Sequence, residues 1–352
     1  MSSSYLDDNF SLVRKSQVLQ LRAKLIQSIR HFFVQHNFLE VETPIRIPSP
    51  APEEHIEAIT SDDWFLQTSP ELCMKRLLSA GFPRIFQISH CFRAAERGNA
   101  HLPEFTMLEW YVAGFDYHQL MDQCQALLIA AFKDMGHDQD ILWQNHGYEP
   151  QNKLCNVIPS AVSRQSRDST YKFQDTSFLK FESHNKKISL APPWERISVA
   201  DVFSKYSPIS LQQALHQEKF DEIMVEYIEP YLGIDRPTYL YDYPVKLAAL
   251  AKIKKSDPTV AERFELYIGG LELANGFSEL TDANEQRQRF EEALKARALK
   301  NWAHYEMPEK FLQALQIMPP SSGIALGIDR LMMLLVDTGK IDDVVAFSPE
   351  SL

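Results

Sequence analysis

The segment ERFELYIGGLELANGFSELTD, residues 262–282, decides the fold of this chain. Its two halves, 263–268 and 271–277, are predicted to be adjacent antiparallel strands that turn at Gly269-Gly270. Paired glycines accept the backbone conformations that a tight hairpin requires. The prediction of a sheet therefore starts from this hairpin.

Three glutamates recur at intervals of seven in this segment: Glu265, Glu272 and Glu279. In the predicted hairpin, Glu265 and Glu272 can approach each other across the ladder. Two close carboxylates repel each other unless a cation lies between them, and Mg²⁺ prefers such hard oxygen ligands together with phosphate oxygens. The segment thus predicts a metal–triphosphate site. The alternative, three solvated surface glutamates, is disfavoured by the apolar residues around them.

Short apolar runs elsewhere in the chain resemble strands, and helical segments separate them. The predicted strands lie at 84–92, 104–111, 238–243 and 323–328, and the predicted helices at 71–80, 117–134, 199–205, 211–230, 284–300 and 329–338. Strands bunched at both ends of the chain indicate an α+β fold, with one mixed, mainly antiparallel sheet flanked by helices.

A helix, a strand and a proline form the first landmark of the chain. Apolar residues recur every three or four positions across 16–36, as in an amphipathic helix. The following residues alternate as in a strand from Leu39 to Thr43, and Pro44 ends this pattern.

The segment FRAAERGNAHLPEFTMLEWY, residues 92–111, combines an arginine, a charged turn, a histidine and a carboxylate-bearing strand. Arg93 can place a bidentate guanidinium on a phosphate, while His101 offers a planar face to a base. Glu109 and Tyr111 stand two positions apart, so they share a strand face and can line one pocket. Taken singly, each residue is also consistent with a surface charge or a structural ion pair.

The segment SSGIALGIDRLMMLL, residues 321–335, is a small-residue strand that runs into a helix through Asp329-Arg330. Small residues let a ligand lie flat against the backbone, and Arg330 can meet a phosphate tail from the start of the helix. A glycine-rich strand turn on its own would be weak support for a site.

The composition is typical of a soluble globular protein. The 352 residues, 45% of them hydrophobic, allow one large domain or two ordinary ones. No apolar run approaches the roughly 18 residues that span a bilayer, and the polar start MSSSYLDDNF is unlike a signal peptide, so we expect a cytoplasmic protein. The four scattered cysteines are predicted to be free thiols. The net charge of −11 disfavours a long tRNA footprint but leaves room for a local ATP site.

Residues 146–192 differ from the rest in being rich in Ser, Asn, Gln and Lys, without steady periodicity. We expect an insertion or a long loop here. It is either a surface excursion or, given its net charge of +3, a basic lip that contacts a macromolecular substrate.

In order and spacing, the segments 92–111, 262–282 and 321–335 resemble the signature motifs of class II aminoacyl-tRNA synthetases. The resemblance is closest to lysyl-tRNA synthetase and covers nearly the whole chain outside 146–192. It implies a single class II catalytic domain over 1–352. It also implies a homodimer formed through motif 1, the helix and strand of the first landmark, to whose dimer interface Pro44 would belong.

Lysyl-tRNA synthetases carry an OB-fold anticodon-binding domain before motif 1, whereas here the motif 1 helix begins near residue 16. A catalytic core of this kind with an acidic charge balance resembles the elongation factor P lysine ligase family, the truncated lysyl-tRNA synthetase paralogues. That family attaches (R)-β-lysine to a lysine of translation elongation factor P. The chain also resembles this ligase family at Ala325, because the family has alanine at this position whereas lysyl-tRNA synthetases usually have glycine.

The resemblance implies roles for individual residues. The amino-acid substrate would be bound by Ser69, Glu71, Glu109, Tyr111, Glu272, Asn275, Glu279 and Ala325. ATP would be bound by Arg93, Glu96, His101, Glu265, Leu266, Gly327 and Arg330, and Mg²⁺ by Glu265 and Glu272. As catalytic residues, Arg93 would hold the α-phosphate and Arg330 the γ-phosphate.

Motif 2 departs from the family pattern at two positions. It usually reads Arg-x-Glu, whereas this chain has two alanines between Arg93 and Glu96, so the glutamate that meets the adenine is displaced by one. Leu102 follows His101 where asparagine is common, which removes one polar contact to the nucleotide.

The implied reaction has two steps: attack of the substrate carboxylate on the ATP α-phosphorus, then attack of a neutral amine on the adenylate. Positioning and charge neutralisation would carry the catalysis. Two alternatives remain open, a truncated lysyl-tRNA synthetase that acts on tRNA and a nonenzymatic paralogue that only binds a ligand or a partner. The sequence alone leaves the choice between lysine and β-lysine undecided.

Overall fold

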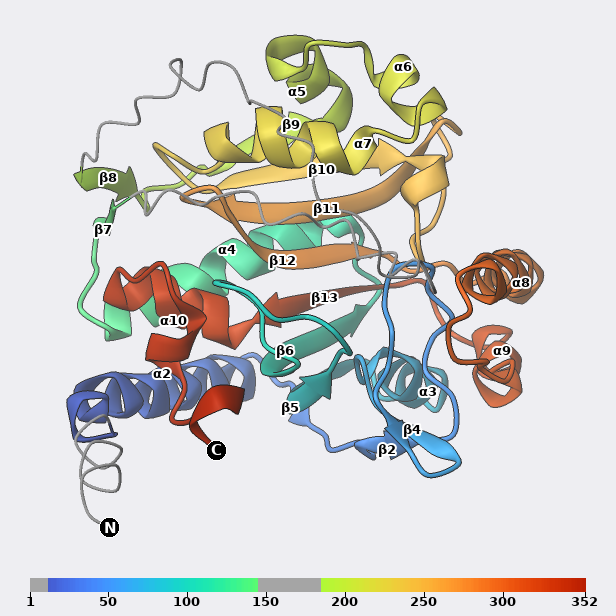
Figure 1. Ribbon diagram of the computed structural model, residues 1–352, viewed down its shortest axis with the longest axis horizontal. Coiled ribbons are helices and arrows are strands. Elements are labelled where there is room, and N and C mark those ends of the chain that lie inside the picture. The colour runs from blue at the N-terminus through green and yellow to red at the C-terminus, as the bar shows by residue number, and fades with distance from the viewer. Residues whose placement is uncertain (1–11, 145–184) are drawn as a thin grey trace, which may run out of the picture.

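The computed structural model describes residues 12–144 and 185–352, and its centre is an eight-stranded sheet with helices on both faces (Figure 1). In spatial order the strands are β1 (Leu39–Glu40), β5 (Arg84–Phe92), β6 (Glu104–Ala113), β13 (Ser321–Gly327), β12 (Leu271–Ser278), β11 (Val260–Ile268), β10 (Thr238–Pro244) and β9 (Glu195–Ser198). The β1–β5 and β10–β9 pairs are parallel, and the other five pairs are antiparallel. The prediction of an α+β fold with a mixed, mainly antiparallel sheet is confirmed.

The predicted hairpin of residues 263–278 is present as β11 and β12. Gly269 and Gly270 join the two strands, and both have positive φ angles, of 65° and 78°. Glycine reaches this backbone region without the strain that a Cβ would cause. The paired glycines therefore fix where the chain turns.

One face of the sheet is covered by α2 (Ser16–Gln35), α4 (Tyr117–Asp134) and α10 (Ile328–Val336). Their apolar side chains form the main core with Phe86 of β5 and Trp110 of β6. Phe33 of α2, for example, stacks on Phe86 with ring centroids 4.5 Å apart. Asp116 begins α4 with a capping box that involves Gln119. Packing of these side chains closes the centre of this face.

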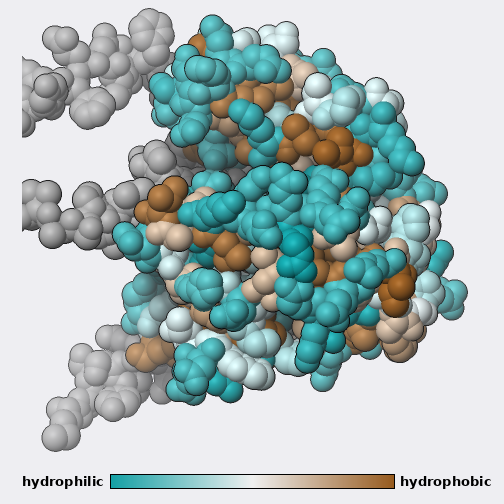
Figure 2. Space-filling view, turned by 90° about the vertical axis from the view of Figure 1, so that its right-hand side faces the viewer, coloured by the Kyte–Doolittle hydropathy of each residue, from teal (hydrophilic) through white to brown (hydrophobic). Residues whose placement is uncertain are grey.

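The opposite face carries α3 (Glu71–Ser79), α8 (Ala283–Leu299) and α9 (Glu309–Leu315). Ile85 and Tyr111 point to this side, next to Phe86 and Trp110 on the other, because successive strand residues alternate between faces. The covering is looser here. Only Gln286, Phe290 and Arg297 of α8 are buried, and Figure 2 shows the end of the molecule with α8 and α9 covered mainly by hydrophilic residues.

A third group of helices packs on β10 at the far edge of the sheet: α5 (Val199–Tyr206), α6 (Leu211–His216), α7 (Phe220–Ile223), the π-helix η1 (Met224–Ile228) and the 3-10 helix η2 (Glu229–Tyr231). The prediction of one helix over 211–230 is wrong. Glu218 has a φ of 55°, which interrupts the helical hydrogen bonds between α6 and α7. The apolar residues keep their helical spacing across the break, because α6 and α7 both contribute buried side chains to the apolar cluster against β10.

The strand predicted from Leu39 to Thr43 is shorter than expected. Pairing with β5 covers only Leu39 and Glu40, and one further hydrogen bond runs from the Val41 N–H to the Phe86 carbonyl at 2.9 Å. Pro44 has no N–H with which to continue the ladder. The chain then enters a small sheet of β2 (Arg46–Ile47), β4 (Trp64–Leu66) and β3 (Thr60–Ser61).

The predicted insertion at 146–192 lies largely outside the described residues. Its last part forms β8 (Asn185–Ser189), which pairs with β7 (Asp140–Gln144). Cys73, Cys91 and Cys124 are free thiols, as predicted, whereas Cys155 lies outside the described residues. None of the helices in the described ranges has the length and apolar character needed to cross a membrane.

Candidate active site

Four adjacent strands place one residue each in a single row across the sheet. Glu109 of β6 lies opposite Ala325 of β13, which lies opposite Asn275 of β12. Asn275 in turn lies opposite Glu265 of β11. Directly paired residues point to the same face of an antiparallel sheet. The row therefore gathers predicted site residues from both halves of the chain on the face toward α3 and α8.

A cavity of about 1560 Å³ opens over this row. The predicted site residues that line it are Ser69, Glu71, Arg93, Glu96, His101, Glu109, Tyr111, Glu265, Glu272, Asn275, Ala325, Gly327 and Arg330. Two others do not. The side chain of Leu266 belongs to the main core on the other face, so only its main chain could meet a nucleotide. Glu279 is fully buried behind the cavity wall.

The carboxylate end of the cavity, which we define as Ser69, Glu71, Lys75, Glu109 and Glu279, is a buried polar network. Ser69 Oγ donates to Glu109 Oε1 at 2.7 Å, and the Tyr111 hydroxyl donates to Glu109 Oε2 at 2.8 Å. Burial raises the pKa of Glu109 to about 7, and the charge of Glu71 adds to this effect. A carboxyl so poised is stabilised in its charged form by a ligand that carries an ammonium group.

Lys75 is the cation of the carboxylate end, and the sequence analysis did not identify it. It follows Glu71 by one helical turn, and its buried Nζ lies 2.5 Å from Glu71 Oε1 and in contact with Glu279. Burial acts to lower the pKa of Lys75, but the charges of Glu279 and Glu71 outweigh it and the net shift is upward. Burial also raises the pKa of Glu279 to about 8. Glu279 Oε1 has no hydrogen-bond partner in the described part of the chain.

The phosphate end, which we define as Arg93, His101 and Arg330, lies on and beside the loop between β5 and β6. The Arg93 guanidinium lies 5.1 Å from the centre of the Phe105 ring, and its Nη1 is 3.7 Å from Glu96 Oε1. Its buried Nε has no hydrogen-bond partner within the described ranges. A partly buried guanidinium with an unused donor suits a phosphate oxygen.

Arg330 joins the loop to the hairpin from the first turn of α10. Its Nη1 donates to the Glu272 carbonyl at 2.8 Å, and its Nε donates to the Ala100 carbonyl at 3.3 Å. Its Nη2 lies 2.6 Å from His101 Nε2, which must accept because a guanidinium only donates. Arg330 thus fixes His101 with the imidazole proton on the other ring nitrogen.

The chain turns between Arg93 and Glu96. Ala95 has a φ of 60°, so the loop turns at this residue. The turn leaves Glu96 lining the cavity next to Arg93.

Glu265 and Glu272 are not directly paired across the hairpin, and Glu272 pairs with the residue two positions after Glu265. Glu272 lies opposite Tyr267, and a bulge separates this pair from the preceding one. Glu265 Oε1 accepts from Arg263 Nη2 at 2.8 Å, and Oε2 accepts from the Tyr267 hydroxyl at 2.7 Å. Within the described residues, no three His, Cys, Asp or Glu side chains are placed to hold a metal. The pair could supply only part of a metal shell.

Three further residues shape the cavity without a signal in the sequence. Gly323 lies under the Tyr111 ring, and a Cβ there would be 2.2 Å from a ring carbon. Glu53 lines the cavity from the loop before β3, and burial, followed by the charge of Glu71, raises its pKa to about 7. Arg297 of α8 holds that loop, since it donates to the Glu53 and Ile56 carbonyls at 3.0 and 2.7 Å. Only the fold brings these residues to the site.

Comparison with known proteins places this arrangement in a family. Residues 4–351 match the family of class II tRNA synthetases (D, K and N). The chain is 37% identical over 341 residues to an elongation factor P--(R)-β-lysine ligase of Haemophilus influenzae, with 94% of each chain covered. Proteins of the same name from Hamiltonella defensa and Proteus mirabilis are 36% identical, with 94% and 93% of each chain covered. The chain belongs to the elongation factor P--(R)-β-lysine ligase family, within the class II synthetases.

Proposed function

We propose that this protein is an ATP-dependent ligase that activates (R)-β-lysine, or lysine, as an aminoacyl-adenylate. The activated acid is then transferred to a lysine side chain of translation elongation factor P. The names of the relatives support the ligase activity and the acceptor.

One observation carries the proposal: a single cavity has carboxylates at one end and arginines at the other. A lysine isomer carries ammonium groups, which suit Glu71 and Glu109 on the cavity wall, with Glu279 buried behind them. A triphosphate carries the opposite charge, which suits Arg93 and Arg330. The substrate carboxylate would meet the α-phosphate between the two ends, over Ala325 and Asn275 of the row.

The proposed chemistry requires no covalent bond to the protein. The substrate carboxylate attacks the α-phosphorus, pyrophosphate leaves, and the acceptor amine later displaces AMP from the acyl carbon. Arg93 would hold the α-phosphate, where negative charge develops, and Arg330 would hold the γ-phosphate of the leaving group. His101 and Glu96 would contact the base. Since the network at Glu109 is already assembled, substrate binding would cost little reorganisation.

Glu265 and Glu272 would hold magnesium that arrives with ATP. Two carboxylates suit an ion that keeps water and phosphate oxygens as its other ligands, and the ion would neutralise part of the phosphate charge. The unpaired Nε of Arg93 is consistent with a phosphate tail nearby. Arg263 now donates to Glu265, so it would shift or share that oxygen when magnesium binds.

We further propose that the chain acts as one catalytic domain over 1–352, with an insertion at 146–192, and forms a homodimer through motif 1. Three apolar residues near Pro44 in the sequence are exposed in this chain: Val34, Leu39 and Ile45. Exposed apolar side chains of this kind support a surface that a second copy of the chain would cover.

The test incubates the protein with ATP, magnesium and each lysine isomer, first alone and then with elongation factor P or tRNA. We expect exchange of labelled pyrophosphate into ATP that depends on the amino acid, and a mass gain of elongation factor P equal to one acylation. Mass gained by tRNA alone would favour a truncated lysyl-tRNA synthetase. Absence of exchange in folded protein would favour a nonenzymatic paralogue.

A further inference from the structure

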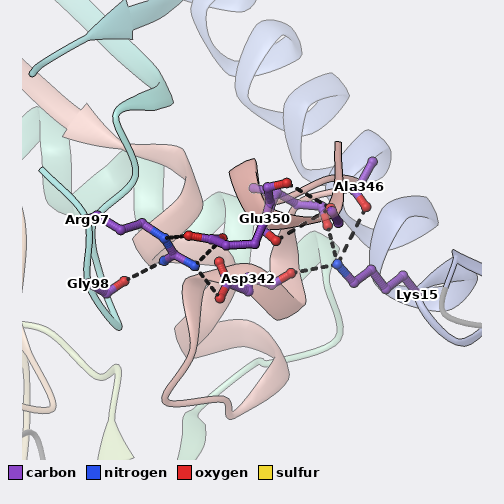
Figure 3. A network of polar contacts seen from close by, with 9 residues as sticks. Lys15, Arg97, Gly98, Asp342, Ala346 and Glu350 are labelled. Atoms are coloured by element: carbon purple, nitrogen blue, oxygen red, sulfur yellow. Dashed lines mark hydrogen bonds and ion pairs between the residues drawn. The ribbon is translucent and has the colours of Figure 1, made fainter. Parts of the chain in front are cut away.

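The tip of the loop between β5 and β6 is fastened to the last residues of the chain. Arg97 donates from Nε and Nη2 to the two oxygens of Glu350, at 2.8 Å each, and from Nη2 to Asp342 at 2.9 Å (Figure 3). A second link joins the backbones, since the Ile341 N–H donates to the Asn99 carbonyl at 2.7 Å. Side chain and main chain thus hold the same loop tip.

The tail is itself fixed to the start of the chain. Lys15 donates to the carbonyls of Asp342 and Val345, at 2.8 and 3.0 Å (Figure 3). The partners of Arg97 come from the 3-10 helices η4 (Ile341–Val344) and η5 (Pro349–Ser351), which are short but ordered by these contacts. The tail therefore connects α2 to the loop.

The other restraints on this loop hold its two sides. The Ala94 N–H donates to the Glu57 carbonyl at 2.8 Å, Arg330 contacts Ala100 and His101, and Ala100 and Leu102 are buried in the main core. At the tip itself, the remaining hydrogen bonds are local. The Gly98 N–H donates to the His101 carbonyl at 3.0 Å, and the Arg97 N–H donates to the Ala95 carbonyl at 3.2 Å. These bonds are internal to the loop and do not fix it relative to the sheet. Arg93 and His101, the proposed ATP contacts, flank this tip on either side in the sequence.

We infer that Arg97 and Glu350 are positioning residues for ATP: the tail holds the loop so that Arg93 and His101 face the nucleotide before it binds. Glu350 lies outside the cavity. Arg97 lines the cavity, but its guanidinium is bound to the tail, so neither residue is proposed to contact the substrate. Their effect is exerted on the affinity for ATP, because an unfastened loop must be ordered at the cost of binding free energy. The inference rests on the proposed ATP site.

The geometry of the contact separates it from an ordinary surface ion pair. Isolated exposed pairs contribute little, whereas bidentate pairs within a network contribute measurably. Arg97 is shared by two carboxylates and a carbonyl, since its Nη1 also donates to the Gly98 oxygen at 3.1 Å. The hydrogen bond from Arg97, the largest cause, lowers the pKa of Glu350 to about 2.

The test measures pyrophosphate exchange in the full chain at saturating lysine isomer. For Glu350→Gln and Arg97→Met we expect the KM for ATP to rise roughly three- to tenfold, with the KM for the amino acid unchanged. The double variant should be no worse than Arg97→Met, because both act through one contact. Glu350→Asp should recover part of the loss.

The matched control is Glu309→Gln, which removes the bidentate partner of Arg287 on the surface of α8 and α9, with oxygens at 2.8 and 2.6 Å. Its KM for ATP should stay at the wild-type value. An unchanged KM for ATP in Glu350→Gln would overturn the inference, as would a lower melting temperature without any change in KM. Wild-type protein that exchanges no pyrophosphate would instead overturn the proposed function, so the two failures are distinct.

Discussion

The two ends of the cavity are built in different ways. At the carboxylate end Glu71, Lys75 and Glu109 are carried by a helix or a strand, and Glu279 directly follows β12. Glu109, Lys75 and Glu279 are buried and contact one another or their neighbours. At the phosphate end Arg93 and His101 lie on either side of a loop whose tip is held by exposed contacts. If the proposed function is correct, the difference teaches that recognition of the amino acid would be part of the folded core, whereas recognition of ATP would depend on how well a loop is held.

The largest expected effect tests whether the carboxylate end belongs to the core. Lys75→Met leaves Glu71 and Glu279 buried without their cation, and we expect the free energy of unfolding to fall by about 3–5 kcal/mol. Denaturant unfolding measures this change. Lys187→Met is the control, since it breaks an exposed pair with Asp140 and should change the free energy by no more than about 0.5 kcal/mol.

Adding Glu279→Gln to Lys75→Met should recover part of the loss, because one uncompensated charge is then removed. If Lys75→Met unfolds at the same denaturant concentration as the wild type, the carboxylate end does not contribute to the stability of the core.

The next effect concerns the phosphate end. Arg93→Met should lower kcat/KM for pyrophosphate exchange by about 10²–10³-fold, because it removes a donor from the developing charge. Its unfolding should be nearly unchanged, since Arg93 is half-buried and its Nε bonds to no described residue. Arg287→Met provides the control for loss of an arginine. A stability loss as large as that of Lys75→Met would contradict the distinction.

The two ends should also differ in their response to pH. Burial raises the pKa of Glu109 to about 7 and that of Glu279 to about 8, from an ordinary value of 4.5. Below these values both carboxyls are neutral and attract an ammonium weakly. The KM for the lysine isomer should therefore fall up to about tenfold for each group as pH rises from 6 to 8.5. Glu109→Gln should remove the step near pH 7.

The stability of the free protein should change in the opposite sense. A carboxyl with a raised folded-state pKa stabilises the fold below its unfolded pKa, and this contribution is lost as pH rises through the folded value. The substrate-free protein should thus lose stability between about pH 4.5 and 8, where Glu109 and Glu279 ionise. Thermal unfolding without the lysine isomer measures how stability changes with pH. The same measurement with the lysine isomer shows whether its stabilising effect increases as pH rises. A protein most stable at pH 8 without substrate would contradict the burial of these groups.

The smallest expected effect refines the carboxylate end. Ala325 lies between Glu109 and Asn275 in the row, so its methyl group bounds the space for the substrate backbone. Ala325→Gly should shift the ratio of kcat/KM for (R)-β-lysine and lysine toward lysine by a few-fold, as is usual for one methyl group in a pocket. An unchanged isomer preference would show that Ala325 does not determine specificity. It would not affect the proposal of adenylate chemistry.

The sequence predicted the main strands of the sheet, and most of the site residues that it predicted line the cavity, because strand periodicity and the glycine turn are local properties. It failed where a property depends on distant partners. Lys75 looks like an ordinary helical lysine until the fold buries it against Glu279. Leu266 stands next to Glu265 in sequence, but strand alternation puts its side chain in the opposite core. The break at Glu218 has no apolar signature, since the periodicity continues across it.

The position of β13 has a consequence for how the protein is made. This strand fills the gap between β6 and β12, yet it follows both of them in the chain and is synthesised later. Until it arrives, β6 and β12 each present an open edge, a state that favours pairing with other chains. The row from Glu109 to Glu265 also lacks Ala325 until then. Nascent chains of this protein should therefore require protection from aggregation until β13 has been synthesised.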